Sequence, residues 1–473
     1  MNNRSLWIVC VAGLVVRLLF ILFGAEVYYG RENIYEAGDT QAWTAAFLNW
    51  LHTGTFTLNP EHEYGYFGRM PGFSFFIGIF YFLSGKDLDT AYSMIGWFQT
   101  LLDVVAVALM YKIGLRLFGS RRFATFVGLL YALYPFIIVW TPLAYSEAMS
   151  VFFMIAAVYL LTHPEIRSYY GWCGALLGVG ALFRPQLLVL IPLVGLYLLY
   201  KYRHNVRLMW MCGAWYAAAI VLTFGLWPAR NYINHGKLII TQDLRGIKNW
   251  NKDVLGYLQY IYSVKAEWEP QFSQIIENRP VDVPEHVNAV PGDSLKFLRA
   301  VELAKTCGSG FSHWRGYWKE PFTEPNCNEE IASIFTQLRQ NQVDHNKMNF
   351  YVWVPLQNLK KSIFKTTLTD TDSAARKAAS LLFIYRTFLI LIGLVGCAWM
   401  IRTKHSAAWM AWITLGFFVT FYLVLCAGTS PQMRNIEMRY FLLCDVLMLL
   451  PAAWLLGFLY SRWRPETPDA PTT

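Results

Sequence analysis

Charged side chains are scarce in this chain of 473 residues. Asp, Glu, Lys and Arg make up 15% of the sequence, whereas 55% of residues are hydrophobic and 17% are aromatic. Soluble domains average about 25% charged residues. The deficit excludes an ordinary soluble enzyme and indicates a membrane protein.

Metal-binding cysteine patterns are also missing. There are eight cysteines but no C-x-x-C pair and no cluster of Cys with His, so we expect no zinc site, no other metal and no cofactor. Most of the cysteines lie in or beside apolar segments, where cysteine usually acts as a small hydrophobe. Cys307 and Cys327 lie in a polar segment, and we predict that they form a disulfide if it faces an oxidising compartment.

The sequence has no internal repeat, low-complexity tract or recognisable leader-cleavage site. Its first residues have the charge order of a signal peptide, but the apolar run is too long, and we interpret it as a retained helix. The net charge of +9 does not indicate nucleic-acid binding, because the basic residues lie in short clusters between apolar runs.

Long apolar runs are abundant. A spanning helix needs about 20 mostly apolar residues. The run 71–85 is apolar but too short to cross, so we expect it to be interfacial or re-entrant. We predict spans near 6–24, 92–113, 123–141, 146–162, 169–183, 185–201, 208–227, 381–401, 406–426 and 440–460.

Basic clusters orient these spans. With a cytoplasmic N-terminus, every cluster of Lys and Arg between spans falls in the cytoplasm, provided that 71–85 does not cross. The outer side then receives a first loop at 25–91, a short turn at 142–149 and a polar segment. We predict a transmembrane module at 1–227, an extracytoplasmic domain at 228–380 with a helix near 328–342, and final spans with a cytoplasmic tail at 381–473.

Carboxylates gather at span ends on the outer side, where ionisable residues are functional candidates. Asp39, before a helical run, is either an N-cap or a general base for an acceptor hydroxyl. Glu36 is either a solvated charge or a support for that base. Glu147, in 144-AYSE-147, is either a first-turn residue favoured by the helix dipole or part of the site.

Arginines lie at the same level. Arg184 stands alone in a long apolar run, and because Pro185 disfavours helix at the preceding residue, we predict a turn there at the outer face. Arg184 then either binds a phosphate or only marks the interface. Arg69, shortly before a Pro-Gly turn, allows the same two interpretations.

Two further arginines follow later in the chain. Arg230 and Asn231 lie just beyond Trp227, an interface anchor. Arg439 opens the last predicted span, where a positive charge opposes the helix dipole. This placement indicates an anionic partner, and Glu437 is one possibility.

Together these residues resemble the bacterial GT-C membrane glycosyltransferases, in the glycosyltransferase 39 group of protein O-mannosyltransferases and lipid A aminoarabinose transferases. The resemblance covers about 1–240 and 380–460 and leaves 244–375 unmatched. It rests on an ordered set of stretches: Gly38-Asp39, Arg69-Met70-Pro71-Gly72, Ser146-Glu147, Phe183-Arg184-Pro185, Trp227-Pro228-Ala229-Arg230-Asn231 with Gly236 after it, and Arg439-Tyr440.

The resemblance implies an all-α polytopic GT-C fold with about ten to twelve spans, interfacial helices in the first outer loop and one extracytoplasmic domain. It also implies transfer of a sugar from a polyprenyl-phosphate carrier, such as undecaprenyl phosphate. The acceptor would be a lipid, glycan or protein outside the bacterial cytoplasmic membrane, and the anomeric carbon would invert.

The resemblance also assigns roles to residues. Asp39 would be the base, and Glu147 would support the site or the acceptor. Arg69 and Arg184 would hold the donor phosphate, with Arg230 and the Arg439-Tyr440 pair lining the donor pocket. Arginines can stabilise a phosphate leaving group without a metal.

The sequence departs from the family pattern at Met70, where relatives often have proline, and in lacking the Asp-Glu pair of the mannosyltransferases. These departures count against a protein mannosyltransferase and not against the fold. One alternative function is an oligosaccharide ligase or polymerase that uses a pyrophosphate-linked glycan. Another is a transporter or flippase, which would predict repeated halves and mid-membrane charges; Asp103 and Asp445 are the acids inside predicted spans.

Overall fold

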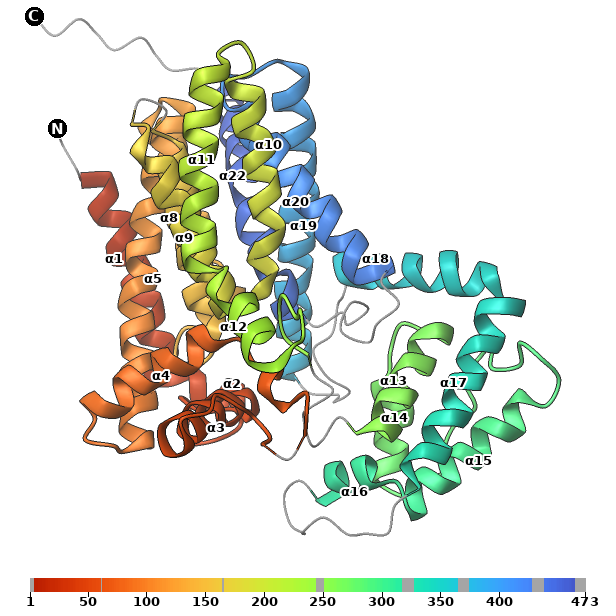
Figure 1. Ribbon diagram of the computed structural model, residues 1–473. Helices are drawn as coiled ribbons and strands as arrows, with labels where there is room; N and C mark the ends of the chain where they lie inside the picture. Colours follow the sequence, from red (N-terminus) through yellow and green to blue (C-terminus); the bar gives the residue numbers. More distant parts are fainter. Residues whose placement is uncertain are drawn as a thin grey trace, which may run out of the picture.

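The computed structural model describes residues 4–60, 62–163, 166–243, 251–316, 327–364, 374–427 and 438–463. This part of the chain is helical and contains no strand. It forms a tall bundle of long helices and a smaller helical domain beside the bundle's lower end (Figure 1). The protein is therefore an all-α, multi-pass membrane protein.

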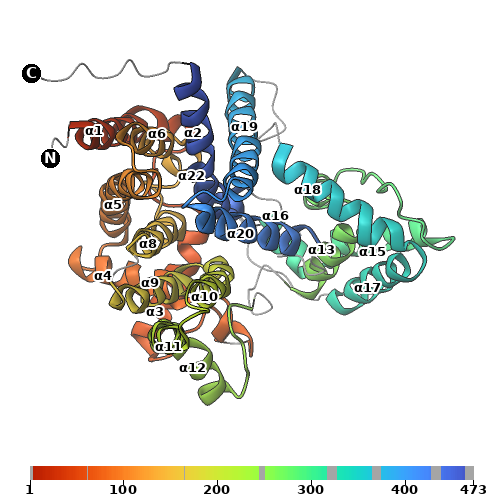
Figure 2. The same ribbon diagram turned by 90° about the horizontal axis from the view of Figure 1, so that it is seen from above.

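The bundle helices follow the predicted spans. Seen from above, α22 lies among the other bundle helices and the smaller domain lies to one side (Figure 2). Four helical segments in the described ranges are long and apolar enough to cross a membrane: Arg4–Tyr29, Val206–Thr223, Ser380–Arg402 and Arg439–Arg462. The bundle comprises α1 (Arg4–Leu19), α5 (Leu88–Phe118), α6 (Arg121–Ala132), α8 (Ser146–Leu161), α9 (Ser168–Phe183), α10 (Leu190–Lys201), α11 (Val206–Thr223), α19 (Ala374–Arg402), α20 (Ala408–Ala427) and α22 (Met438–Trp463).

One predicted span, 123–141, is not a continuous helix. α6 ends at Ala132, and only the short helix α7 (Pro135–Ile138) follows it. Tyr134 is extended, with ψ 107°, because the residue before a proline is pushed out of the helical region. The chain therefore turns at the lower end of the bundle and leads into α8.

Short helices cover this lower end. α4 packs against α3, α5 and α9. With 13 residues it is about 20 Å long, too short to cross, as predicted. The short elements are η1 (Phe20–Gly24), α2 (Ala25–Tyr29), α3 (Gly38–Thr53), η2 (Gly65–Phe67), α4 (Pro71–Leu83), η3 (Pro185–Val189) and α12 (Leu226–His235).

The two acids inside spans are paired with arginines that the sequence analysis did not single out. Arg17 donates to Asp103 from Nε at 2.6 Å, and Tyr131 donates to the same carboxylate. Arg386 donates to Asp445 from Nε at 2.6 Å. All four charged residues are buried. Charges within a bilayer are expected to pair, and these pairs tie α1 to α5 and α19 to α22.

The smaller domain contains α13 (Lys252–Val264), α14 (Glu269–Ile276), α15 (Asp293–Thr306), α16 (Ser309–Gly316) and α17 (Asn328–His345). We call it the outer domain, after the side of the membrane on which the sequence analysis expects it. Aromatic residues such as Tyr257, Phe297 and Phe335 form its own core. α17 confirms the helix predicted at 328–342. A disulfide joins Cys307 to Cys327, with Cα atoms 5.5 Å apart, and links the end of α15 to the start of α17.

Candidate functional site

Charged side chains from separate segments meet at the lower end of the bundle. Asp39 Oδ1 accepts from Arg69 Nη2 at 2.7 Å, and Asp39 Oδ2 accepts from Arg439 Nη1 at 2.5 Å. Arg439 Nη1 lies 4.0 Å from Glu147 Oε1, which lies 2.5 Å from Arg184 Nη1. Cations and anions thus alternate in the order Arg69, Asp39, Arg439, Glu147, Arg184. We call these five residues the ion-pair chain.

Asp39 lies in the first turn of α3, but it is not the helix cap. The N-cap is Ala37, whose N–H donates to Thr40 Oγ1 at 3.1 Å, so the N-cap interpretation of Asp39 is wrong. The N–H of Asp39 donates to Tyr145 Oη at 3.1 Å. This contact fixes the backbone of α3 against the turn before α8, and the carboxylate faces the two arginines.

Arg184 lies at the predicted turn. α9 ends at Phe183, and Arg184 is extended, with φ −148° and ψ 113°. Its side chain is only 8% exposed and lies over the ring of Tyr440, with Cζ 5.5 Å from the centroid. An arginine that only marks the interface would extend its guanidinium to water. Arg184 instead turns inward to Glu147.

Glu147 is in the first turn of α8 and is the most buried member of the ion-pair chain. Its side chain is 1% exposed. Arg184 is its nearest described cation, and Oε2 accepts no hydrogen bond from the residues that the structure describes. Such a buried carboxylate is suited to holding Arg184 in place more than to meeting a substrate.

The place of Arg439 at the start of a helix predicted an anionic partner, and the structure shows two. They are Asp39 and Glu147, and Glu437 lies outside the described residues. Arg439 Nη2 also donates to Tyr440 Oη at 3.3 Å. The first turn of α22 therefore completes a site that begins in the first outer loop.

Aromatic rings enclose the ion-pair chain, and sequence reasoning missed most of them. Arg69 lies over Trp43, with Cζ 5.1 Å from the ring centroid, and the rings of Trp43 and Tyr145 are 5.5 Å apart. The ring of Tyr145 also lies 5.9 Å from Arg439 Cζ. The one available signal for Tyr145 was its place in 144-AYSE-147, directly before Ser146 and Glu147.

Electrostatics make this site suitable for an anion. Three arginines and two carboxylates leave one net positive charge. Burial on its own would raise the pKa of Asp39, but the guanidiniums of Arg69 and Arg439 outweigh it and hold that pKa well below its usual value. Asp39 is therefore ionised, and its affinity for a proton is low while both arginines contact it.

Three predicted site residues lie apart from the ion-pair chain. Glu36 accepts from Gln41 Nε2 at 3.1 Å. Arg230 donates to the carbonyl oxygens of Phe56 and Tyr66 at 2.9 and 3.1 Å, and Asn231 Nδ2 donates to that of Ile239 at 2.8 Å. The two contacts of Arg230 hold the segment after α11 against the loop that precedes α4.

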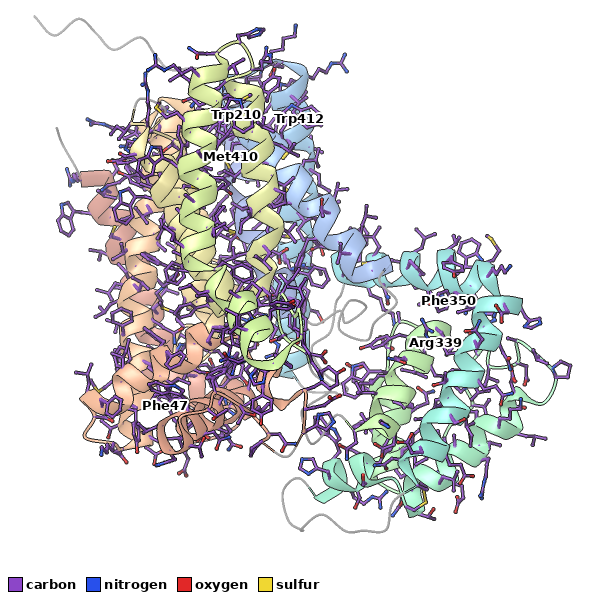
Figure 3. The ribbon with its side chains drawn as sticks, viewed as in Figure 1. Phe47, Trp210, Arg339, Phe350, Met410 and Trp412 are labelled. Atoms are coloured by element: carbon purple, nitrogen blue, oxygen red, sulfur yellow. A yellow bond between two sulfur atoms is a disulfide. The ribbon has the colours of Figure 1, made fainter. Side chains whose placement is uncertain are left out.

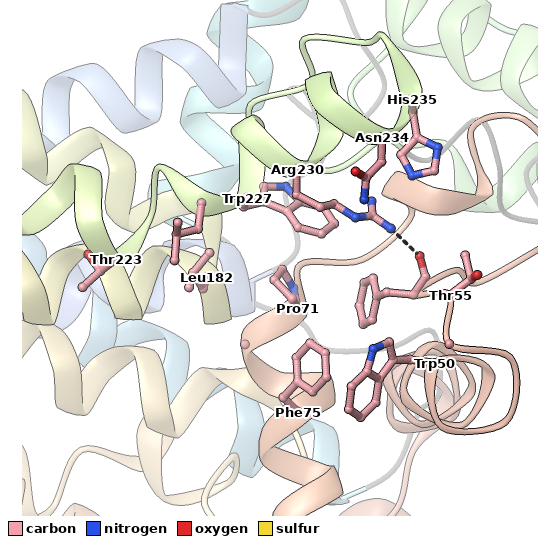
Figure 4. A pocket seen from close by; sticks show the side chains of 14 residues that line it. Trp50, Thr55, Pro71, Phe75, Leu182, Thr223, Trp227, Arg230, Asn234 and His235 are labelled. Carbon is pink, nitrogen blue, oxygen red and sulfur yellow. Dashed lines mark hydrogen bonds between the residues drawn. The ribbon is translucent and has the colours of Figure 1, made fainter.

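Arg230 also lines a groove of about 740 Å³ next to the site. Figure 4 shows Trp50, Phe75 and Pro71 on one side of the groove and Trp227 on the other. Arg230 donates a hydrogen bond to the carbonyl oxygen of Phe56 across the upper end of the groove. Pro71 lies two residues after Arg69, so the groove adjoins the ion-pair chain. Its apolar lining and single cation suit a lipid chain with an anionic end.

Within the described ranges, no three residues among His, Cys, Asp and Glu form a group that could hold a metal ion. The described polar groups of the site are thus arginines and carboxylates without a metal-ligand cluster.

This helical bundle, with short helices and a charged site at one end, has the fold of a solved oligosaccharyltransferase. The family described as dolichyl-phosphate-mannose-protein mannosyltransferase (PMT_2) matches residues 69–227. That stretch contains Arg69, Glu147 and Arg184. No curated protein matches the chain.

Two solved structures of one archaeal enzyme show the same fold. The archaeal oligosaccharyltransferase AglB from Archaeoglobus fulgidus, in complex with an inhibitory peptide and a dolichol-phosphate, has a TM-score of 0.50 at 11% identity over 98% of this chain and 51% of that chain. The same enzyme tethered with an acceptor peptide has a TM-score of 0.51 at 12% identity, with the same coverage. The chain thus spans about half the length of these enzymes. ArnT from Cupriavidus metallidurans also matches, with a TM-score of 0.29 at 13% identity over 88% of this chain and 73% of that chain.

Proposed function

We propose that the protein transfers a sugar from a polyprenyl-phosphate carrier to an acceptor hydroxyl on the outer side of the bacterial cytoplasmic membrane. The observation that carries this proposal is the ion-pair chain. It lies at the end of the bundle that also bears the interfacial helices and the outer domain. The orientation of the basic loops favours the outer side for this end.

The arginines are the donor-binding part of the proposal. Guanidiniums bind phosphate through paired N–H groups, and Arg69, Arg184 and Arg439 lie along one continuous path. In the proposed complex the donor phosphate lies against Arg69 and Arg184, beside Tyr440, and Glu147 positions Arg184. The isoprenoid chain lies in the groove beside Arg230.

Asp39 is the proposed general base. It takes the proton of the acceptor hydroxyl as the acceptor oxygen bonds to the anomeric carbon from the face opposite the phosphate. The bond from that carbon to the phosphate oxygen breaks, the electron pair leaves with polyprenyl phosphate, and the configuration inverts. The arginines stabilise the charge that develops on the leaving group.

The ion pairs of Asp39 couple the base to the donor. While Arg69 and Arg439 both contact the carboxylate, its pKa is low and it is a weak base. A donor phosphate competes for the same guanidiniums, which raises the pKa of Asp39 toward its usual value. The acceptor is therefore activated only when a donor is bound.

The test uses purified protein with undecaprenyl-phosphate sugars and compares wild type with Asp39→Asn. Glu36→Gln is the matched control, since Glu36 is a carboxylate of the same loop outside the ion-pair chain. We expect Asp39→Asn to bind donor but to release polyprenyl phosphate at least about 100-fold more slowly, the scale of general-base catalysis. Glu36→Gln should retain activity. Full turnover by Asp39→Asn would remove the base assignment.

A second candidate is an oligosaccharide transferase that uses a pyrophosphate-linked glycan. The similarity of the protein's fold to that of an archaeal oligosaccharyltransferase supports this second candidate. The two candidate functions are distinguished by an assay that offers both kinds of carrier, one with a monosaccharide on a monophosphate and one with an oligosaccharide on a pyrophosphate. Turnover of only the second carrier would replace our proposal, and movement of intact carrier between leaflets without sugar release would indicate a flippase.

A further inference from the structure

The segment that joins the outer domain to the bundle has two unlike faces. It consists of η6 (Asn349–Trp353) and α18 (Val354–Phe364). Phe350, Val354, Asn358 and Ser362 recur every four residues and are all at most 1% exposed. One side of the segment is therefore packed within the protein.

The other side exposes large apolar and aromatic side chains to the surroundings. On this side Trp353 is 54% exposed and Leu356 and Phe364 are each 49% exposed; at the start of the segment Tyr351 is 57% exposed. Lys347 and Lys360 are exposed beside them. Exposed apolar residues in such a row need an apolar partner or a lipid environment.

Contacts with α19 place the end of α18 at the depth of the membrane. Arg386 Nη1 donates to the carbonyl oxygen of Ser362 at 2.6 Å, and Thr387 Oγ1 donates to that of Ile363 at 2.6 Å. Arg386 lies six residues after Ser380, where the apolar span begins. At 1.5 Å per residue, the end of α18 is about 9 Å inside that boundary.

The start of the segment lies at the level of the outer domain. Asn349 Nδ2 donates to the carbonyl oxygen of Val264 in α13 at 3.4 Å, and Phe350 lies under Arg339 of α17. Figure 3 labels Phe350 and Arg339 in the upper part of the outer domain. The segment therefore runs obliquely from the outer domain into the span region, as Figure 1 shows for α18.

We propose that η6 and α18 form a membrane-immersed anchor whose exposed face contacts the phospholipids of the outer leaflet. Tyr351 and Trp353 lie at the headgroup level, where aromatic residues are enriched, and Leu356 and Phe364 meet acyl chains. Lys347 and Lys360 lie near the phosphates of the headgroups. This face continues the lipid-facing surface of α19, where Ile384 is 56% exposed. The inference does not depend on the proposed function.

The experiment places a photoreactive benzoylphenylalanine at Trp353 or Leu356 of the full chain. The protein is reconstituted in vesicles of phosphatidylethanolamine and phosphatidylglycerol with labelled acyl chains. Ile384 on α19 is the lipid-facing comparator, and Leu295 on α15, 72% exposed, is the water-facing one. All four positions are exposed, so the substitutions leave the core packing unchanged, and size-exclusion profiles verify each variant.

We expect lipid adducts at 353 and 356 within about twofold of those at 384 and at least tenfold above those at 295. Adduct levels equal to those at 295 would overturn the proposal. Crosslinks from 353 or 356 mainly to a second copy of the chain would also overturn it, because that outcome assigns the face to a protein interface.

Discussion

Arg439 contacts one carboxylate and lies near the other, so its charge acts on both halves of the ion-pair chain. It comes from α22, whereas Asp39 and Glu147 come from α3 and α8. A single side chain thus acts together with Arg69 on how strongly Asp39 holds a proton, and together with Arg184 on how well the charge of Glu147 is compensated.

Replacing Arg439 by glutamine tests its effect on Asp39. The depressed pKa of Asp39 keeps the base ionised down to low pH, and activity is lost as pH falls through that pKa. Removing one guanidinium raises the pKa, so the acidic limb of the pH profile of kcat/KM should move to higher pH in Arg439→Gln. Arg31→Gln is the control, because Arg31 is in the same loop as Asp39 but lies over Tyr29 and is not part of the ion-pair chain. An unmoved limb in Arg439→Gln would contradict the assignment of Asp39 as the titrating base.

The buried pair of Arg184 and Glu147 has a consequence for stability. Arg184→Met leaves a carboxylate that is 1% exposed without its nearest cation, which should lower the free energy of unfolding by about 3 kcal/mol. The double variant Arg184→Met/Glu147→Leu removes both charges and should recover most of that loss. Thermal unfolding in detergent measures the stability of the single and the double variant. A double variant less stable than the single one would show that the pair is not coupled in this way.

At the scale of elements, the site depends on how closely α4 approaches α9. A Cβ added at Gly72 would lie 2.7 Å from the carbonyl carbon and oxygen of Leu182. Arg69 precedes this contact and Arg184 follows it, so the contact sets the distance between the two proposed phosphate ligands.

Gly72→Ala should therefore move α4 away from α9 without changing any charge. Overpacking of this kind typically costs about 1–3 kcal/mol, and we expect a raised KM for donor together with a lower melting temperature. Gly213→Ala on α11 is the matched control, because a Cβ there meets nothing within 4 Å. Equal behaviour of the two variants would contradict the role of this contact.

The span helices were predictable because each contains an apolar run long enough to recognise, and the turn at Arg184 was predictable because Pro185 follows it. The break at Pro135 was missed, since apolar composition alone does not mark where a helix stops. Asp39, Arg69, Glu147, Arg184 and Arg439 were each found from their places at helix ends. Their pairing was not, because it joins residues up to 400 positions apart. Arg17 and Arg386 were overlooked because their partners lie on other helices.

At the scale of the whole molecule, the chain has separate cores in the bundle and in the outer domain. The disulfide between Cys307 and Cys327 belongs only to the second. The remaining cysteines take no part in this disulfide and lie in the bundle: Cys10, Cys173, Cys212, Cys397, Cys426 and Cys444.

Reduction should therefore weaken the outer domain alone. A disulfide that closes a loop of 20 residues contributes about 3 kcal/mol. Limited proteolysis with and without reductant should show faster cleavage within 251–345 and unchanged cleavage of the bundle. Mass spectrometry of the unreduced protein provides the direct test, and free thiols at 307 and 327 would contradict the pairing.

The bond between Asp39 and Arg439 also bears on how the protein is made. Asp39 leaves the ribosome 400 residues before Arg439, which belongs to α22. Until α22 inserts, the Asp39 carboxylate lacks Arg439, which is one of its two cations. Glu147 lacks the same arginine, its second nearby cation. The nascent chain therefore carries an incomplete site while those 400 residues are made, and the arrival of α22 completes it.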